Sequence, residues 1–80
     1  MCEGDLVTIS LVNGYTPFIG RISYLKDGNA YTDTQYDKVN ENSIGIIVNF
    51  PLVNHRQDYY VVIMESRLGW FYDYEIEIVK

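Results

Sequence analysis

Residues 58–73, with the sequence DYYVVIMESRLGWFYD, decide the fold class of this chain. Two runs of β-branched and aromatic residues, 58–65 and 68–72, stand on either side of Ser66-Arg67. Runs of this length and composition, separated by two residues, predict two β-strands joined by a tight turn. Because the first run is apolar on both faces, we predict that it is a central strand of a sheet.

The preceding sequence repeats this pattern of short strands and turns. We predict three strands, over residues 5–12, 15–26 and 29–34. The pairs Asn13-Gly14 and Asp27-Gly28 accept the positive φ of a hairpin turn, so the three strands are expected to form a meander. In the first strand Val7, Ile9 and Leu11 are expected to face the core. Pro17 cannot donate to a ladder, so the second strand starts late or lies on an edge.

The remaining sequence predicts a loop and two more strands. Residues 33–43 are the most polar stretch and are expected to form an exposed loop. Residues 43–50 predict a strand that Pro51 ends. The last strand is expected over 75–79, after a short turn at Asp73-Tyr74. Its alternation predicts that Ile76 and Ile78 point in, while Glu75 and Glu77 point out. No stretch has helical periodicity, so we predict an all-β fold.

Length and charge exclude several classes of protein. Eighty residues predict a single domain, 1–80, and the 11 acidic residues outnumber the 6 basic ones for a net charge of −5. Scattered cations disfavour binding to double-stranded nucleic acid. No apolar run is long enough for a membrane span, and the first residues are not those of a secretory signal. A single cysteine, Cys2, adds to the expectation of a cytoplasmic protein.

The order of these signals resembles that of SH3-like small β-barrels of the KOW and Tudor type. The resemblance rests on five segments, GDLVTI (4–9), SIGIIVNF (43–50), DYYVVIME (58–65), LGWFYD (68–73) and YDYEIEIV (72–79). The resemblance implies a barrel in which residues 11–42 form an inserted hairpin or long loop between the first two barrel strands. Short proteins of this style are common among phage-encoded proteins. YDYE (72–75) also resembles the ALYDY motif of peptide-binding SH3 domains. That motif lies near the start of those domains, whereas YDYE lies near the end of this sequence, so no proline-peptide groove is inferred.

Catalytic, metal and cofactor sites are not predicted. His55 stands in a loop with no evident orienting partner, and we interpret it as a solvated histidine. Cys2 has no evident histidine partner either, and one cysteine with one histidine does not supply the four ligands of a zinc site. The six glycines are dispersed rather than gathered in a phosphate-binding loop. We therefore predict that the chain is not an enzyme and needs no cofactor.

Aromatic and acidic residues are the candidate binding residues. Eight tyrosines, three phenylalanines and one tryptophan exceed what a small core needs, which predicts an exposed aromatic patch. Tyr36 lies in the polar 33–43 segment. Glu75 and Glu77 are expected to gather with Glu3 and Asp5, because the first and last strands of such a barrel lie side by side. The candidate partner-binding residues are Trp70, Tyr72, Tyr74, Glu75, Glu77, Tyr59 and Tyr36.

These features predict a non-enzymatic binding protein that acts by protein–protein contact. If the chain is phage-encoded, as the resemblance implies, the expected role is that of an inhibitor or adaptor directed at a host protein in the host cytoplasm. The first alternative is a structural, virion-associated or self-associating protein, a homo-oligomer whose aromatic faces pack between copies. The lesser alternative is a single-stranded nucleic-acid binder that stacks bases on aromatic rings.

Overall fold

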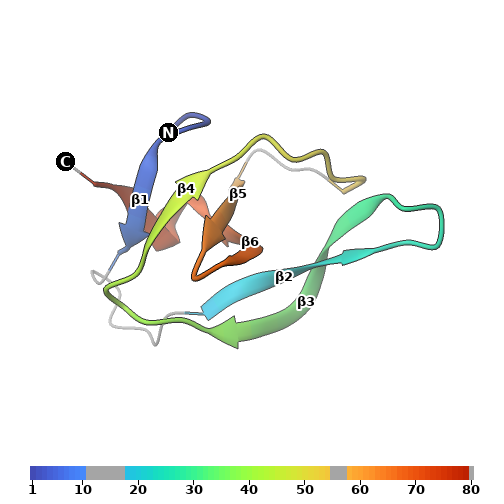
Figure 1. Ribbon diagram of the computed structural model, residues 1–80, viewed down its shortest axis with the longest axis horizontal. Coiled ribbons are helices and arrows are strands. Elements are labelled where there is room, and N and C mark those ends of the chain that lie inside the picture. Colours follow the sequence, from blue (N-terminus) through green and yellow to red (C-terminus); the bar gives the residue numbers. More distant parts are fainter. Residues whose placement is uncertain (11–17, 55–57, 80) are drawn as a thin grey trace.

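The computed structural model describes residues 1–10, 18–54 and 58–79. These residues form one antiparallel sheet of seven strands, so the fold is all-β as predicted (Figure 1). The elements are β1 (Leu6–Ile9), β2 (Phe18–Tyr24), β3 (Ala30–Lys38), β4 (Ile44–Ile47), β5 (Tyr59–Met64), β6 (Arg67–Tyr72), the 3₁₀ turn η1 (Asp73–Glu75) and β7 (Ile76–Ile78).

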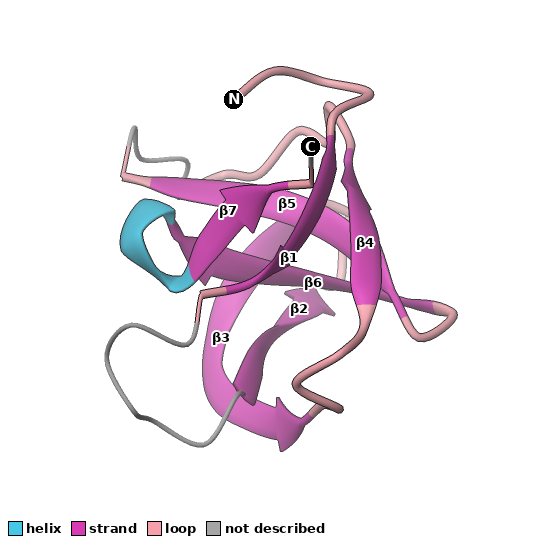
Figure 2. Cartoon of the chain, turned by 90° about the vertical axis from the view of Figure 1, so that its left-hand side faces the viewer, coloured by secondary structure: helices cyan, strands magenta, loops and turns pink. Residues whose placement is uncertain are grey.

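The sheet has the strand order β3-β2-β6-β5-β4-β1-β7. Among the described strands, β3 and β7 do not pair with each other, so the sheet is open and these two strands are its edges. Figure 2 shows β7, β1 and β4 side by side, with η1 leading into β7. The β2–β3 hairpin comes between β1 and β4 in the chain and joins the sheet at β6 instead.

The central hairpin predicted from residues 58–73 is confirmed. β5 and β6 pair along their whole length, from Tyr59 opposite Tyr72 to Met64 opposite Arg67. The turn lies one residue earlier than predicted, at Glu65-Ser66, where both residues have positive φ (52° and 61°). Two consecutive positive φ angles are those of a type I′ turn, whose twist matches the twist of the paired strands.

The predicted three-stranded meander is wrong. β1 pairs with β4 and β7, whereas β2 pairs with β3 and β6. The Asp27-Gly28 turn is confirmed, since Gly28 has a φ of 90° and its N–H donates to Leu25 O at 3.0 Å. Asn13-Gly14, Leu11 and Pro17 lie outside the described residues. The described part of β2 begins at Phe18, and β2 lies between β3 and β6 rather than at an edge of the sheet.

The predicted loop over residues 33–43 is wrong for its first half, because β3 continues to Lys38. Polar cross-strand pairs rather than apolar burial stabilise this part of the strand. Ser23 Oγ donates to Asp33 Oδ2 at 2.6 Å, and Arg21 forms a bidentate pair with Asp37 at 2.6 and 2.8 Å. β4, in contrast, is shorter than predicted and ends at Ile47, before Pro51.

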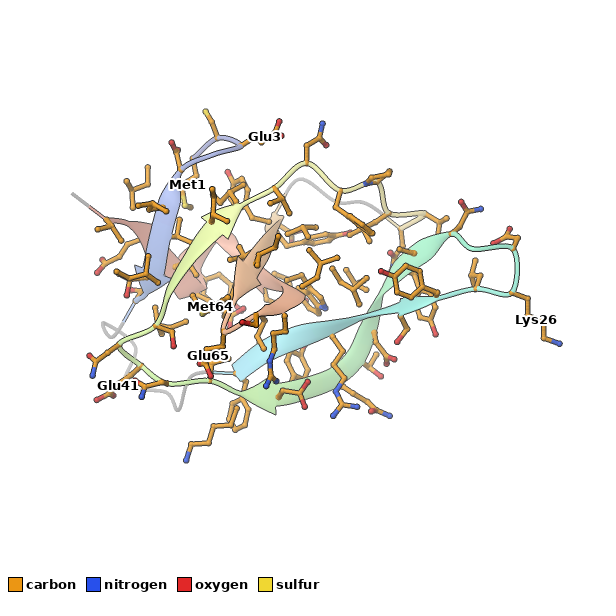
Figure 3. The ribbon with its side chains drawn as sticks, in the orientation of Figure 1. Met1, Glu3, Lys26, Glu41, Met64 and Glu65 are labelled. Carbon is orange, nitrogen blue, oxygen red and sulfur yellow. The ribbon has the colours of Figure 1, made fainter. Side chains whose placement is uncertain are left out.

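The sheet has one main buried cluster and four further buried residues outside it. The main core lies inside its curve, where Figure 3 labels Met64. It consists of Val7, Ile9, Ile19, Val39, Ile47, Val62, Met64, Phe71 and Ile76. Four further buried residues lie outside this cluster: Ala30, Tyr59, Val61 and Trp70. The prediction that β5 is apolar on both faces is therefore confirmed.

Two predictions for the last strand have different outcomes. Ile76 is buried as predicted, but Ile78 keeps 42% of its surface exposed. Ile78 lies near the end of an edge strand, where the sheet covers it from one side only. Glu77, opposite Thr8, is exposed as predicted, whereas Glu75 belongs to η1 and is half-buried.

Candidate functional site

Four aromatic side chains from β3, β6 and η1 form a continuous series, which we call the aromatic row: Tyr36, Trp70, Tyr72 and Tyr74. The ring centroids of Tyr36 and Trp70 are 5.7 Å apart, and those of Trp70 and Tyr72 are 5.0 Å apart in an edge-to-face contact of 85°. Tyr72 and Tyr74 stack almost in parallel, 5.5 Å apart with an interplanar angle of 4°. The structure thus brings these sequence-predicted residues together.

Trp70 is the fixed centre of the aromatic row. It is buried, and its Nε1–H donates to Arg21 O at 3.1 Å. Gly20 lies opposite Trp70 in the β2–β6 ladder and gives the ring its space, since a Cβ at this position would lie 2.3 Å from the indole. A glycine within a strand often marks such a close approach. The sequence contained this signal at Gly20, but it did not reveal which side chain approaches.

Tyr59 is a buried residue that packs against Trp70 of the aromatic row. Its ring lies 5.5 Å from that of Trp70, and its hydroxyl donates to Asn54 O. Because Tyr59 is buried, it positions Trp70 and offers little surface to a partner. Tyr36 and Tyr74 provide the accessible area, and Tyr74 keeps 60% of its surface exposed. The two exposed tyrosines thus lie at the two ends of the aromatic row.

Glu75 adds a carboxylate to the aromatic row. Its Oε1 accepts a hydrogen bond from the Tyr72 backbone N–H at 2.8 Å, which ties η1 to the end of β6. Burial raises the pKa of Glu75 above its ordinary value, against the opposing effect of this hydrogen bond. Burial also raises the pKa of Tyr36, and Tyr72, Glu75 and Tyr74 add to the increase.

The register of β1 and β7 separates Glu75 from Asp5, two of the residues expected to form an acidic patch. β1 and β7 pair as expected, but the register places Glu75 beside Ser10, whose N–H donates to Glu75 O. Asp5 is five residues further along β1, roughly 16 Å away at the rise of a strand. Asp5 instead accepts a hydrogen bond from the Cys2 backbone N–H at 2.7 Å. Glu77 lies opposite Thr8 on β1 and is exposed.

A solvent-open cleft of about 380 Å³ lies between β2 and β6. Arg21 and Arg67 both contact Asp37 there, at 2.6 and 3.5 Å. Hydrogen bonds from Arg21 hold the pKa of Asp37 below its ordinary value. Glu65 also lines the cleft, so its charges balance, and its ion pairs fasten the β2–β3 hairpin to β6.

Cys2 is exposed, and His55 lies outside the described residues. Within residues 1–10, 18–54 and 58–79, no three His, Cys, Asp or Glu side chains are grouped so that they could hold a metal ion. In the same part of the chain, no helix has the length and apolar character needed to cross a membrane.

Comparisons with protein-family models, with curated proteins and with solved structures gave no match to this chain. The functional interpretation therefore depends on the geometry of the aromatic row.

Proposed function

We propose that this chain is a non-enzymatic binding protein that contacts a protein partner through the aromatic row and Glu75. The observation that carries the proposal is the arrangement of two accessible tyrosines, Tyr36 and Tyr74, around the buried Trp70. Tyrosine combines a large apolar area with a polar tip, and residues of this type dominate the binding energy of protein interfaces.

The geometry supports a preorganised contact surface. Tyr74 is stacked on Tyr72, and Tyr72 is packed edge-on against Trp70. Side chains that are ordered before binding lose less conformational entropy when a partner docks. The half-buried carboxylate of Glu75 and the net charge of −5 favour a partner that presents a cationic group beside its apolar contact.

The proposal includes an SH3-like barrel as the scaffold. Its support is the strand succession β7-β1-β4-β5-β6, the 3₁₀ turn between β6 and β7, and the hairpin inserted between β1 and β4. We extend the proposal to a phage-encoded inhibitor or adaptor that acts on a host protein in the cytoplasm. This extension follows from the sequence resemblance and from the small size and acidic charge of the chain.

A single-stranded nucleic-acid binder is the second candidate, and the parallel stack of Tyr72 and Tyr74 is the observation that favours it. Stacked aromatic rings can extend a column of bases. The carboxylate of Glu75 opposes phosphate binding, however, and the six cations of the chain are scattered. Titration of labelled oligonucleotides at low ionic strength separates the candidates, because salt-sensitive binding would support nucleic acid.

The test of the proposed function is capture of a partner from a lysate of the source cell, or of its host if the chain is viral. Tyr74→Ala removes an accessible end of the aromatic row. Tyr24→Ala is its matched control, since Tyr24 is equally exposed (60%) but lies on the β2–β3 hairpin outside the aromatic row. We expect a stoichiometric partner that wild type and Tyr24→Ala retain and Tyr74→Ala loses. Equal retention by both variants would contradict the proposal.

A further inference from the structure

Glu75 is a half-buried carboxylate to which the structure assigns no cation. Its Oε1 accepts the Tyr72 N–H at 2.8 Å. In the part of the chain that the structure describes, the ion pairs join Arg21 and Arg67 to Asp37, and none of them includes Glu75. A charge that is withdrawn from water is unfavourable unless an opposite charge compensates for it. Burial accordingly raises the pKa of Glu75.

The local structure does not need this charge. The hydrogen bond from the Tyr72 N–H ties η1 to the end of β6, and the uncharged amide oxygen of a glutamine side chain could accept it equally. Glutamine would thus close the turn without the cost of removing a carboxylate from water. A charge that opposes stability and that the turn does not require is typical of a binding site.

Tyr36 brings an exposed aromatic ring to the same region from β3. Its ring contacts Trp70, and 47% of its surface is exposed. Glu75 adds to the increase in the pKa of Tyr36, so the carboxylate acts electrostatically on this ring. The face of an aromatic ring attracts a cation, as does a carboxylate. Both groups therefore favour a cation at this end of η1.

We propose that Glu75 and Tyr36 bind the guanidinium group of an arginine side chain of the protein partner. This inference rests on the proposed function, because it names the group that the aromatic row receives. Guanidinium is planar and weakly hydrated, so it stacks on aromatic rings and pairs with partly buried carboxylates. The ammonium of lysine is compact and strongly hydrated, and it would lose more hydration at this place. Because Oε1 accepts the Tyr72 N–H, Oε2 is the oxygen that receives the guanidinium.

The test is an NMR titration of the ¹⁵N-labelled full chain with two small probes, acetyl-arginine methylamide and acetyl-citrulline methylamide. Citrulline has the shape of arginine but carries no charge. The Tyr72 backbone amide and the Trp70 indole N–H report on the site, because they belong to the aromatic row. We expect the arginine probe to bind with a Kd of about 1–10 mM and the citrulline probe at least about tenfold more weakly.

Substitutions assign this preference to the two residues. Glu75→Gln keeps the acceptor for the Tyr72 N–H and should bind the two probes equally. Glu41→Gln is the matched control, because Glu41 is an exposed glutamate in the turn before β4 (Figure 3), and it should keep the preference for arginine. Tyr36→Ala should weaken the binding of the arginine probe, and thermal unfolding checks that each variant is folded.

Two results would overturn the proposal. One is equal behaviour of the two probes with wild type, including no binding of either up to about 50 mM. The other is a preference for arginine that survives Glu75→Gln. If partner capture still depends on Tyr74 in either case, the proposed function stands and only the assignment of arginine fails. A partner that Tyr74→Ala retains as well as Tyr24→Ala does would instead contradict the proposed function.

Discussion

Gly20→Ala tests the packing that fixes the aromatic row. The new Cβ would lie 2.3 Å from Cε2 and Nε1 of Trp70, whereas non-bonded carbon atoms prefer about 3.5–4.0 Å. The indole ring must therefore retreat by more than about 1 Å. Its hydrogen bond to Arg21 O, now 3.1 Å long, would then exceed the normal range.

The cost of this change can be estimated from its parts. Inserting a methyl group into a packed site costs about 1–3 kcal/mol, and losing the indole hydrogen bond costs about 1 kcal/mol. Alanine loses less conformational entropy than glycine when the chain folds, and this difference offsets about 0.5–1 kcal/mol of the cost. We expect Gly20→Ala to lower the free energy of unfolding by about 2 kcal/mol, which lowers Tm by roughly 8–16 °C in a domain of this size.

Fluorescence and thermal unfolding together provide the assay. Trp70 is the only tryptophan in the chain, so its emission reports directly on the aromatic row. We expect the emission of Gly20→Ala to shift to the red as the ring leaves its buried position. Gly20→Ala combined with Trp70→Phe should be less destabilised than the two single changes predict together, because the residues are in contact. An unchanged Tm with unchanged emission would refute the reasoning.

Three further substitutions give distinct expectations. Ser66→Gly should raise the free energy of unfolding by about 0.5–1 kcal/mol in denaturant titrations, because Ser66 has a φ of 61° that glycine adopts without strain; a decrease would contradict the turn geometry. Hydrogen bonds from Arg21 lower the pKa of Asp37, so this pair stabilises the fold above the ordinary Asp pKa, and the contribution is lost as pH falls through the lowered value. Asp37→Asn should therefore lower Tm at pH 7 and weaken its decrease upon acidification, which a Tm series from about pH 7 to about pH 2 measures. Burial raises the pKa of Glu75, so its ionised form opposes folding above that pKa, and stability rises as pH falls through it. Glu75→Gln retains an acceptor for the Tyr72 N–H and should match or exceed wild-type Tm at pH 7 without this rise; a clear loss of stability would contradict the assignment.

Local sequence signals predicted the elements that local interactions determine. The central hairpin of residues 58–73 and the Asp27-Gly28 turn follow from β-branched runs and from residues that accept positive φ. Trp70 and Phe71 are neighbours in β6, and strand alternation accounts for their different positions, with Phe71 in the main core and Trp70 in the aromatic row. Features of this kind depend only on the alternation of side chains between the two faces of a strand.

Elements that depend on distant partners were not predicted. The second half of β3 has the polar composition of a loop. It forms a strand because Arg21 and Ser23 on the neighbouring strand hydrogen-bond to its side chains, and these contacts are not visible in the sequence. The burial of Ile78 was predicted from alternation alone, which cannot show that a strand lies at the edge.

The aromatic row was predicted only as a set of residue types. Tyr72 and Tyr74 are close in the chain, whereas Tyr36 reaches Trp70 because the β2–β3 hairpin docks on β6. Glu75 was expected to point to solvent, but η1 turns it back towards the Tyr72 backbone. Non-local docking of this kind has no signature in strand alternation.

The two edges of the open sheet differ in what they offer to another chain. The start of β3 is covered by the segment that contains Leu52, and Asn54 Oδ1 accepts the Thr32 N–H. The other edge, β7, is three residues long with Glu77 at its centre. If two copies joined antiparallel through β7 about that residue, their carboxylates would stand directly opposite each other, and like charges in this position are unfavourable. A charged residue at the centre of so short an edge strand therefore disfavours end-to-end growth of the sheet through β7.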